Sequence, residues 1–335
     1  MQPTSRTPIA DYDQKLDIIE HVNLGHTKAL LAIAHVYINE QVENAQLVDL
    51  FEEGIILQCQ IGDLIESHFV AFLTQDSLHH NVHNLAMHAM KKLGKLISQF
   101  WHFQLLKKQQ VSRNMCRLFL KSDSPLADQS PAGYAWRFIL ERFSNKPDSQ
   151  HINTHLGRYY TLRNTEKSSP NLDYADIAVV DIFQHNDTAG SLWTQDLTVG
   201  EFVVANNEFY EQTDHLTTGR ALLIADETSL PTVAKLLENW QNPIPPTVIS
   251  ITQDPADQTY LNENLFPAGS QLFRFEYSES ADQILTFLQQ HPEIEKVWGA
   301  LENQQAKTIR HYLRNERQFK AENNRVKAYW IKNKP

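Results

Sequence analysis

The chain has 335 residues, of which 41% are hydrophobic and 21% charged, and its formal net charge is −10. This composition is typical of a globular protein with two or three domains, and the acidic charge argues against a general nucleic-acid binder. The two cysteines, Cys59 and Cys116, are too few for an iron–sulfur site or a disulfide framework. Redox chemistry would therefore require a cofactor that cysteine does not hold.

The N-terminus, Met1 to Tyr12, is polar and lacks the apolar core of a signal peptide. No apolar run reaches membrane-spanning length, so a cytoplasmic protein without membrane insertion is expected. The charge is uneven, because nine Lys or Arg and two Glu lie between Lys307 and the C-terminus. This basic region is expected either to receive an anionic ligand or partner, or to form a solvated helix face and tail.

Residues 1–99 are predicted to form a small α+β domain. Helical spacing and strand-like alternation predict helices over 17–38 and 84–99, and strands over 48–60 and 68–73. Eight histidines occur in this part, and His79, His83 and His88 can share one helical face, which suggests a metal or haem site. No acidic or cysteine ligand stands beside them at a metal-binding spacing. Packed and surface histidines are therefore the favoured interpretation.

Residues 100–215 are predicted to form an antiparallel β-barrel domain. Short strands separated by polar turns are expected over 104–110, 115–121, 136–141, 158–163 and 177–185. On the strand that begins at Arg158, Arg158 and Tyr160 point to one face. A guanidinium fork suits a phosphate, and a phenol ring suits a flat heterocycle. The alternative is an ordinary strand with solvated charges at its ends.

A glycine turn at Gly190 and Ser191 follows the last of these strands and opens a short helical stretch. Backbone N–H groups at a helix start form an anion site that suits a pyrophosphate. A Gly-Ser turn is common by itself. Placed after Arg158 and Tyr160, it completes a set of groups for a nucleotide cofactor.

Residues 216–335 are predicted to form an α/β domain with a parallel sheet. Strands are expected over 221–225, 247–252, 271–276, 296–300 and 326–331, with helices over 232–240, 280–290 and 303–317. In such a sheet, ligands bind at the carboxyl ends of the strands. The loops 225–231 and 300–303 lie at such ends and are expected to converge on a nucleotide.

Four segments in this order, over roughly residues 100 to 335, resemble the siderophore-interacting proteins, which are FAD-dependent ferric-siderophore reductases of the ferredoxin-reductase superfamily. The segments are R-Y-Y-T-L-R from Arg158, the stretch from Asp181 to Trp193, L-L-I-A-D-E-T-S-L-P from Leu222, and the end of the chain from W-G-A-L-E at Trp298 to A-Y-W at Trp330. The family patterns that they resemble are R-x-Y-T, H-x-x-G-x-x-x-x-W, G-D-E-T-x-L-P, A-G-E and G-Y-W.

The resemblance implies an FAD-binding barrel over 100–215 and an NAD(P)H-binding α/β domain over 216–335. It implies that Arg158 contacts an FAD phosphate, that Tyr160 stacks on the isoalloxazine, and that Thr161 lies near the reactive edge of the ring. The cofactor-binding residues that we expect are Arg158, Tyr160, Thr161, His185, Gly190, Ser191, Trp193, Asp226, Glu227, Thr228 and Glu302, and the expected substrate-binding residues are Lys327 and Lys332. No catalytic side chain and no metal site are expected.

The implied reaction passes electrons from NAD(P)H through FAD to Fe(III) in a siderophore or another chelate, which releases the iron. Two departures from the family patterns lie on the nicotinamide side, where Ala225 and Leu301 replace glycines. We expect Leu301 to project near the place where the nicotinamide docks. FAD binding is therefore better supported than efficient use of NAD(P)H, and an electron-donor protein is an alternative source of electrons.

Two other interpretations stay open. The segment from His21 to Leu31 resembles the start, H-x-N-x-x-H-x-x-A-L, of an accessory domain of haem-utilisation proteins. That resemblance suggests a flavin reductase that serves haem utilisation. The departures at Ala225 and Leu301 suggest instead a non-catalytic iron- or haem-related binding protein with a degenerate nicotinamide site.

Overall fold

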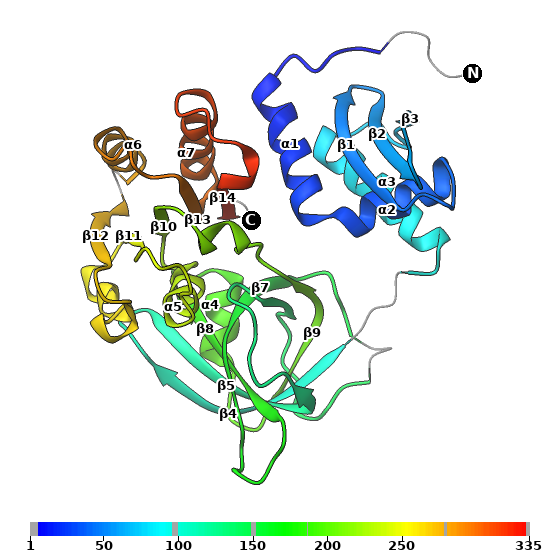
Figure 1. Ribbon diagram of the computed structural model, residues 1–335. Coiled ribbons are helices and arrows are strands. Elements are labelled where there is room, and N and C mark those ends of the chain that lie inside the picture. Colours follow the sequence, from blue (N-terminus) through cyan, green and yellow to red (C-terminus); the bar gives the residue numbers. More distant parts are fainter. Residues whose placement is uncertain (1–5, 96–99, 149–151, 186, 278–279, 333–335) are drawn as a thin grey trace. The chain divides into compact units, whose positions relative to one another are not determined.

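The computed structural model describes residues 6–95, 100–148, 152–185, 187–277 and 280–332 (Figure 1). The chain divides into two compact units, residues 1–98 and 99–335. The first is an α+β unit. The second combines an antiparallel barrel with a parallel sheet, so the predicted fold class is confirmed.

The first unit has a three-stranded antiparallel sheet in the order β1-β2-β3, with three helices. Its elements are α1 (Tyr12–Gly25), α2 (Thr27–Tyr37), β1 (Asn44–Phe51), β2 (Gly54–Ile61), β3 (Leu64–Ala71) and α3 (Leu78–Lys92). The helical segment predicted over 17–38 is two helices, which meet at His26. The helix predicted over 84–99 begins earlier, at Leu78, and residues 96–99 lie outside the described residues.

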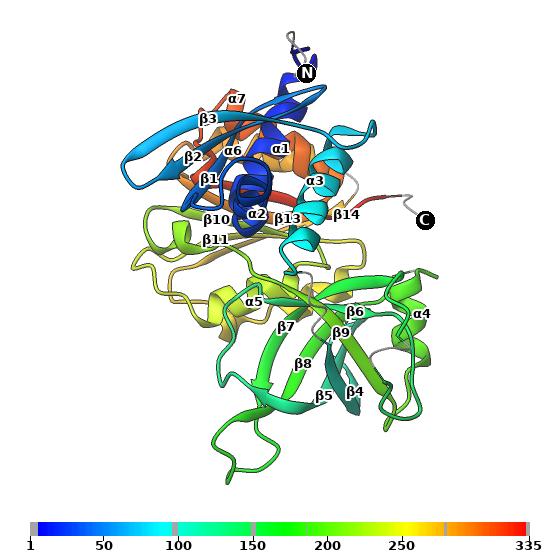
Figure 2. The same ribbon diagram turned by 90° about the vertical axis from the view of Figure 1, so that its right-hand side faces the viewer.

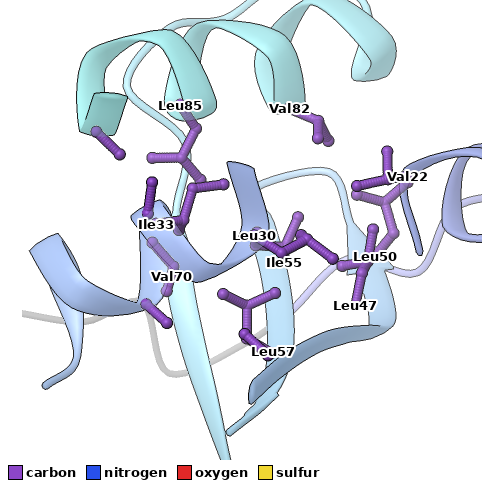
Figure 3. Close-up of a cluster of buried hydrophobic side chains, with 14 of the residues drawn as sticks. Val22, Leu30, Ile33, Leu47, Leu50, Ile55, Leu57, Val70, Val82 and Leu85 are labelled. Atoms are coloured by element: carbon purple, nitrogen blue, oxygen red, sulfur yellow. The ribbon is translucent and has the colours of Figure 1, made fainter. Parts of the chain in front are cut away.

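The core of the first unit forms where α2 and α3 pack on one face of the sheet. Leu30 and Ile33 of α2 are fully buried, because their i, i+3 spacing places both on the same helix face (Figure 3). Leu57 of β2 and Leu85 of α3 complete the same cluster. Buried and exposed residues alternate along most of β1, so its apolar side chains face this core.

Asn23 fixes α1 to the edge of this sheet. Its amide nitrogen donates to the Leu47 carbonyl at 2.8 Å, and its amide oxygen accepts from the Leu47 N–H, also at 2.8 Å. Leu47 lies at a bulge, where the β1–β2 pairing shifts between Leu47 and Asp49. The asparagine therefore satisfies both backbone groups of one strand residue.

The barrel of the second unit has six strands in the closed order β4-β5-β8-β7-β6-β9. They are β4 (Trp101–Gln110), β5 (Met115–Leu126), β6 (Ala135–Ile139), β7 (Gly157–Glu166), β8 (Ala175–Phe183) and β9 (Phe202–Phe209). β9 was not predicted, because its apolar run is short and gives way to the polar residues Asn206, Asn207 and Glu208. β9 closes the barrel by pairing with both β4 and β6.

The sheet of the second unit has five strands, all parallel, in the order β12-β11-β10-β13-β14. Its elements are β10 (Ala221–Ala225), α5 (Leu230–Glu238), β11 (Thr247–Thr252), β12 (Gln271–Glu276), α6 (Ser280–Gln290), β13 (Lys296–Glu302), α7 (Asn303–Asn315) and β14 (Asn324–Trp330). In this order β11 and β12 lie on one side of β10, and β13 and β14 lie on the other. The strand order therefore reverses between β10 and β13, which is where open α/β sheets bind ligands.

The two faces of this sheet have separate cores. α5 lies between the sheet and the barrel on one face, while α6 and α7 cover the other (Figure 2). Because side chains alternate along β13, Trp298 and Ala300 face α5, and Val297 and Leu301 face α6 and α7. Leu301 is fully buried there. The expectation that Leu301 projects toward a nicotinamide was wrong, because the strand period turns it into the core.

An ion pair and a tyrosine hydrogen bond join the barrel to the sheet. Arg163 of β7 donates from both terminal nitrogens to the carboxylate of Glu238 on α5, at 2.7 and 2.6 Å. Tyr260 donates to Asp181 of β8 at 2.5 Å, and Arg117 of β5 binds the same carboxylate at 2.7 Å. These contacts fix the relative position of the barrel and the sheet within the second unit.

Both cysteines, Cys59 and Cys116, are free and buried, and burial raises the pKa of each thiol. Within the described part of the chain, no helix is long and apolar enough to cross a membrane. No three or more His, Cys, Asp or Glu side chains of the described residues are grouped so that they could hold a metal ion.

Candidate functional site at the junction of barrel and sheet

The N-terminal half of β7 presents side chains to both of its faces. Arg158 is exposed, and its guanidinium donates to the Gly157 carbonyl at 3.0 Å. Tyr160 is half-buried and packs against the barrel core. Thr161 points the other way, to α5, and its hydroxyl lies 3.1 Å from the hydroxyl of Thr232. The alternation that the sequence predicts for this strand is therefore present.

Tyr160 is held between a second aromatic ring and a glycine. Its ring is parallel to that of Trp193 on α4 (Ala189–Asp196), with centroids 6.2 Å apart and an interplanar angle of 2°. A hydrogen bond holds the Trp193 indole in place, because its Nε1 donates to the Glu141 carbonyl at 3.1 Å. A Cβ on Gly190 would lie only 2.2 Å from the Tyr160 hydroxyl. Gly190 is thus required for the position of Tyr160.

The start of α4 is tied to the end of β8 by hydroxyl groups. Thr188 caps the helix by accepting from the Ser191 N–H. The Ser191 hydroxyl is buried and accepts from the His185 N–H at 2.9 Å. Ser191 therefore supports the turn with its hydroxyl, and its N–H is engaged by the Thr188 cap.

The His185 imidazole belongs to an aromatic cluster that spans the barrel and the sheet. It stacks on Phe183, with centroids 5.3 Å apart, and lies 5.9 Å from the Trp330 ring. Trp330 in turn stacks on Tyr277 at 6.1 Å. Burial lowers the pKa of His185, which favours the neutral form of the ring.

On the sheet side, Asp226 holds the loop after β10 in place. Its carboxylate accepts from the Thr228 N–H and hydroxyl at 2.9 and 2.6 Å, and from the Trp330 indole at 2.7 Å. The loop reaches β13 as well, because the Ser229 hydroxyl donates to the Ala300 carbonyl at 2.6 Å. The two loops that were predicted to converge are therefore in contact.

Glu227 and Asp226 are adjacent carboxyl groups with little exposure. Glu227 is 2% exposed and accepts from the Gln253 N–H at 2.5 Å. Burial raises the pKa of Asp226 to about 6 and that of Glu227 to about 7. Both side chains point inward and are engaged by the protein's own backbone or side chains.

Glu302 caps α7. Its carboxylate accepts from the N–H groups of Gln304 and Gln305, at 2.6 and 3.4 Å, and from the Lys332 N–H at 3.2 Å. The Lys332 side chain is exposed. Negative charge at a helix start is favourable, so the capping role explains Glu302 by itself.

A buried glutamate that the sequence did not indicate lies between the barrel and the sheet. The side chain of Glu211, in the connection from β9 to β10, is fully buried. Lys327 of β14 donates to it at 2.6 Å and Tyr329 at 2.9 Å. Lys327, expected to bind substrate, is thus ion-paired within the fold. Nothing in the local pattern around Glu211 distinguishes it from the surface glutamates.

Comparisons with known proteins agree with this architecture. A family model described as siderophore-interacting protein matches residues 218–333. No curated protein sequence matches the chain. The family match confirms the resemblance to siderophore-interacting proteins over residues 218–333, and the solved structures below share the fold.

The siderophore-interacting protein from Acinetobacter baumannii has a TM-score of 0.59 and 16% identity, over 71% of this chain and 92% of that chain. The siderophore-interacting protein SipS from Aeromonas hydrophila has a TM-score of 0.55 and 18% identity, over 71% of this chain and 94% of that chain. A flavohemoglobin from Malassezia yamatoensis, solved with bound FAD and haem, has a TM-score of 0.50 and 13% identity, over 76% of this chain and 66% of that chain. At these identities the structures show a shared fold.

Proposed function

We propose, starting from the match of residues 218–333 to the siderophore-interacting protein family, that this chain is an FAD-dependent ferric-chelate reductase. It would take electrons from NAD(P)H or another donor and pass them to Fe(III) held by a siderophore or another chelate in the cytoplasm. The observation that carries the proposal is the Tyr160–Trp193 ring pair, with Gly190 against the Tyr160 hydroxyl and Arg158 exposed on the same strand.

The residues on the barrel side fit FAD. An exposed guanidinium suits a phosphate, and the half-buried phenol ring of Tyr160 offers a flat surface to an isoalloxazine. Gly190 leaves the space that Tyr160 occupies, and the turn that contains it supplies backbone N–H groups at the start of α4. When bound, FAD would supply the hydride and single-electron chemistry that these side chains lack.

The sheet side fits a nucleotide at its strand ends. The loop of Thr228 and the end of β13 meet where the strand order reverses, which is the general ligand position in this architecture. Asp226, Glu227 and Glu302 would shape this edge by holding the backbone. The exposed cation Lys332 would favour an anionic ferric chelate, whereas the charge of Lys327 is already paired with Glu211.

The test is the visible spectrum of the purified protein after reconstitution with FAD, recorded without oxygen before and after NADPH or NADH. We expect flavin bands that bleach with the nicotinamide and return when a ferric siderophore is added, while a ferrous chelator reports Fe(II). Haem in place of the siderophore examines the haem-linked alternative. A protein that takes up no FAD overturns the proposal.

A non-catalytic binding protein is the second candidate, and the inward-facing carboxylates of Asp226, Glu227 and Glu302 favour it. It predicts that FAD binds and stays oxidised with either nicotinamide. Reduction by light with a chemical electron donor then separates the two cases. A flavin that is reduced by light and reoxidised by the chelate indicates a reductase with another donor. A flavin that the chelate does not reoxidise indicates a binding protein.

A further inference from the structure

Two histidines of the first unit meet where α1 ends and α2 begins. The Nε2 atoms of His21 and His26 lie 3.1 Å apart, and both residues are exposed. On a continuous helix only residues three or four apart are neighbours, so this pair would point to different sides. The contact exists because the helix breaks at His26, where φ is −133° and ψ is 34°. The break brings the His26 ring back to His21.

The orientation of the two rings is poor for an ordinary hydrogen bond. Their centroids are 4.8 Å apart, and their planes make an angle of 69°. A straight N–H···N hydrogen bond of this length would hold the centroids about 5.4 Å apart, because each nitrogen lies about 1.15 Å from the centre of its ring. The shorter separation means that the two Nε2 atoms do not point directly at each other.

Two imidazoles that bind one metal ion have this arrangement. Metal–imidazole bonds are about 2.1 Å long, and with an angle of about 95° at the metal they place the two nitrogens about 3.1 Å and the two centroids about 4.8 Å apart. Both separations are those of His21 and His26. In the bound state each ring carries its hydrogen on Nδ1, so both Nε2 lone pairs are available to the ion.

The fold holds the backbone of both ligands in place. Asn23, two residues after His21, ties α1 to β1 through its two hydrogen bonds with Leu47. The His26 N–H donates to the Val22 carbonyl at 2.9 Å, and the His26 carbonyl accepts from the N–H of α2 residues at 3.0 Å. A site with its ligands preset in this way loses little freedom when an ion binds.

We propose that His21 and His26 form a binding site for a divalent transition-metal ion in the first unit. Imidazole nitrogens suit Cu²⁺, Ni²⁺ and Zn²⁺, and water would fill the positions that the pair leaves open. The ring of His79 on α3 adjoins the pair, with its centroid 5.8 Å from that of His21, but it is not needed for this geometry. The inference concerns the first unit and does not depend on flavin.

The test is a calorimetric titration of the full-length, metal-free protein, without a histidine tag, with Ni²⁺ and with Zn²⁺. We expect His21→Ala and His26→Ala each to weaken binding by about 10- to 100-fold, since each removes one of two protein ligands. Circular dichroism of the metal-free variants shows whether they are folded. Equal affinity in both variants and the unmodified protein overturns the inference, as does a protein that binds neither ion at micromolar concentration.

His80→Ala combined with His83→Ala is the matched control. These two histidines are also exposed and lie one turn apart on α3, so they are the competing pair for a metal. The double variant removes two imidazoles and should bind both ions as the unmodified protein does. Loss of binding in this variant, with binding kept in His21→Ala, would place the ion on α3 and overturn the inference.

A second measurement needs no substitution at the helix break. In ¹⁵N-labelled protein, Zn²⁺ should shift the Nε2 resonances of His21 and His26 together and leave those of His80 and His83 in place. Because it uses the unmodified chain, this result cannot come from misfolding of a variant. Nε2 resonances of His21 and His26 that stay unchanged when Zn²⁺ binds would overturn the inference.

Discussion

On the barrel side of the candidate site, Arg158 is exposed and Tyr160 is half-buried, whereas on the sheet side Asp226, Glu227 and Glu302 are 0%, 2% and 5% exposed. The first pair leaves hydrogen-bonding and stacking surfaces toward solvent. The three carboxylates bind indole, hydroxyl and backbone N–H groups of the protein itself. If the cofactor binds as we propose, the barrel residues would contact it directly and the three carboxylates would act only by holding loops. The sequence pattern does not distinguish these two roles.

Two arginines of β7 give the largest expected contrast. Arg163→Ala should lower the free energy of unfolding by roughly 2 to 4 kcal/mol, because Glu238 loses its bidentate partner while remaining partly buried. Arg158→Ala should leave stability unchanged and weaken FAD binding by roughly 10- to 100-fold, the value of one charge-assisted hydrogen bond. Urea unfolding and flavin-fluorescence titration measure the two effects. Loss of stability in Arg158→Ala would contradict the assignment of Arg163 to stability and of Arg158 to ligand binding.

The buried carboxyl groups on the sheet side should make the stability of the protein depend on pH. The folded protein raises the pKa of Glu227 from 4.5 to about 7, so it binds the proton more tightly than the unfolded chain does. Stability associated with Glu227 is therefore complete below pH 4.5 and is lost as the pH rises through 7. Glu227→Gln keeps an acceptor for the Gln253 N–H and should be more stable than the unmodified protein by roughly 3 kcal/mol at pH 8.

Unfolding free energies at pH 5 and pH 8 measure this effect. The advantage of Glu227→Gln should shrink at the lower pH. Glu263→Gln, at an exposed glutamate of the same unit, is the control and should show no such change between the two values. An advantage that does not depend on pH would mean that burial of the charge is not the cause.

The fit between Gly190 and Tyr160 predicts an intermediate effect. Gly190→Ala should displace the phenol from its place beside Trp193 and lower stability by about 1 to 3 kcal/mol, which is typical of overpacking. In a Tyr160→Phe background the same change should cost less, because the clashing hydroxyl is gone. A double-mutant cycle measures the difference. Equal costs in the two backgrounds would refute the contact.

The smallest expected effect concerns Glu302. Glu302→Ala removes the cap of α7 and should lower the free energy of unfolding by about 1 kcal/mol, with FAD affinity unchanged. Thermal unfolding of the second unit and flavin titration check both parts. If instead stability is unchanged and nicotinamide binding weakens, Glu302 contacts the ligand, and the difference between the two sides of the site disappears.

Much of the second unit could be predicted from periodicity. The bounds of β10, β11, β12 and α6 are those expected, because each is a short apolar or amphipathic run between clear turns. β9 was missed since half of it is polar. Both outcomes have the same cause. The local sequence pattern indicates which residues of a segment are buried, but it does not indicate which strands pair with one another.

The site was predictable only in part. Tyr160 and Gly190 lie together, and Arg158 is exposed two residues before Tyr160 on the same strand. The direction of a side chain was not predictable where tertiary contacts decide it. Leu301 faces a core because of its place in the strand period, and Glu211 acquires its role only because β14 brings Lys327 and Tyr329 to it.

The contact of Asn23 with Leu47 has a consequence for how short motifs are transferred between proteins. In this chain, the asparagine of the pattern H-x-N-x-x-H joins a helix to a strand bulge through two hydrogen bonds. In this chain, folding alone therefore accounts for the asparagine of the pattern. Assigning a haem-related role to such a chain requires evidence from the flanking histidines, because the asparagine would be selected in either case.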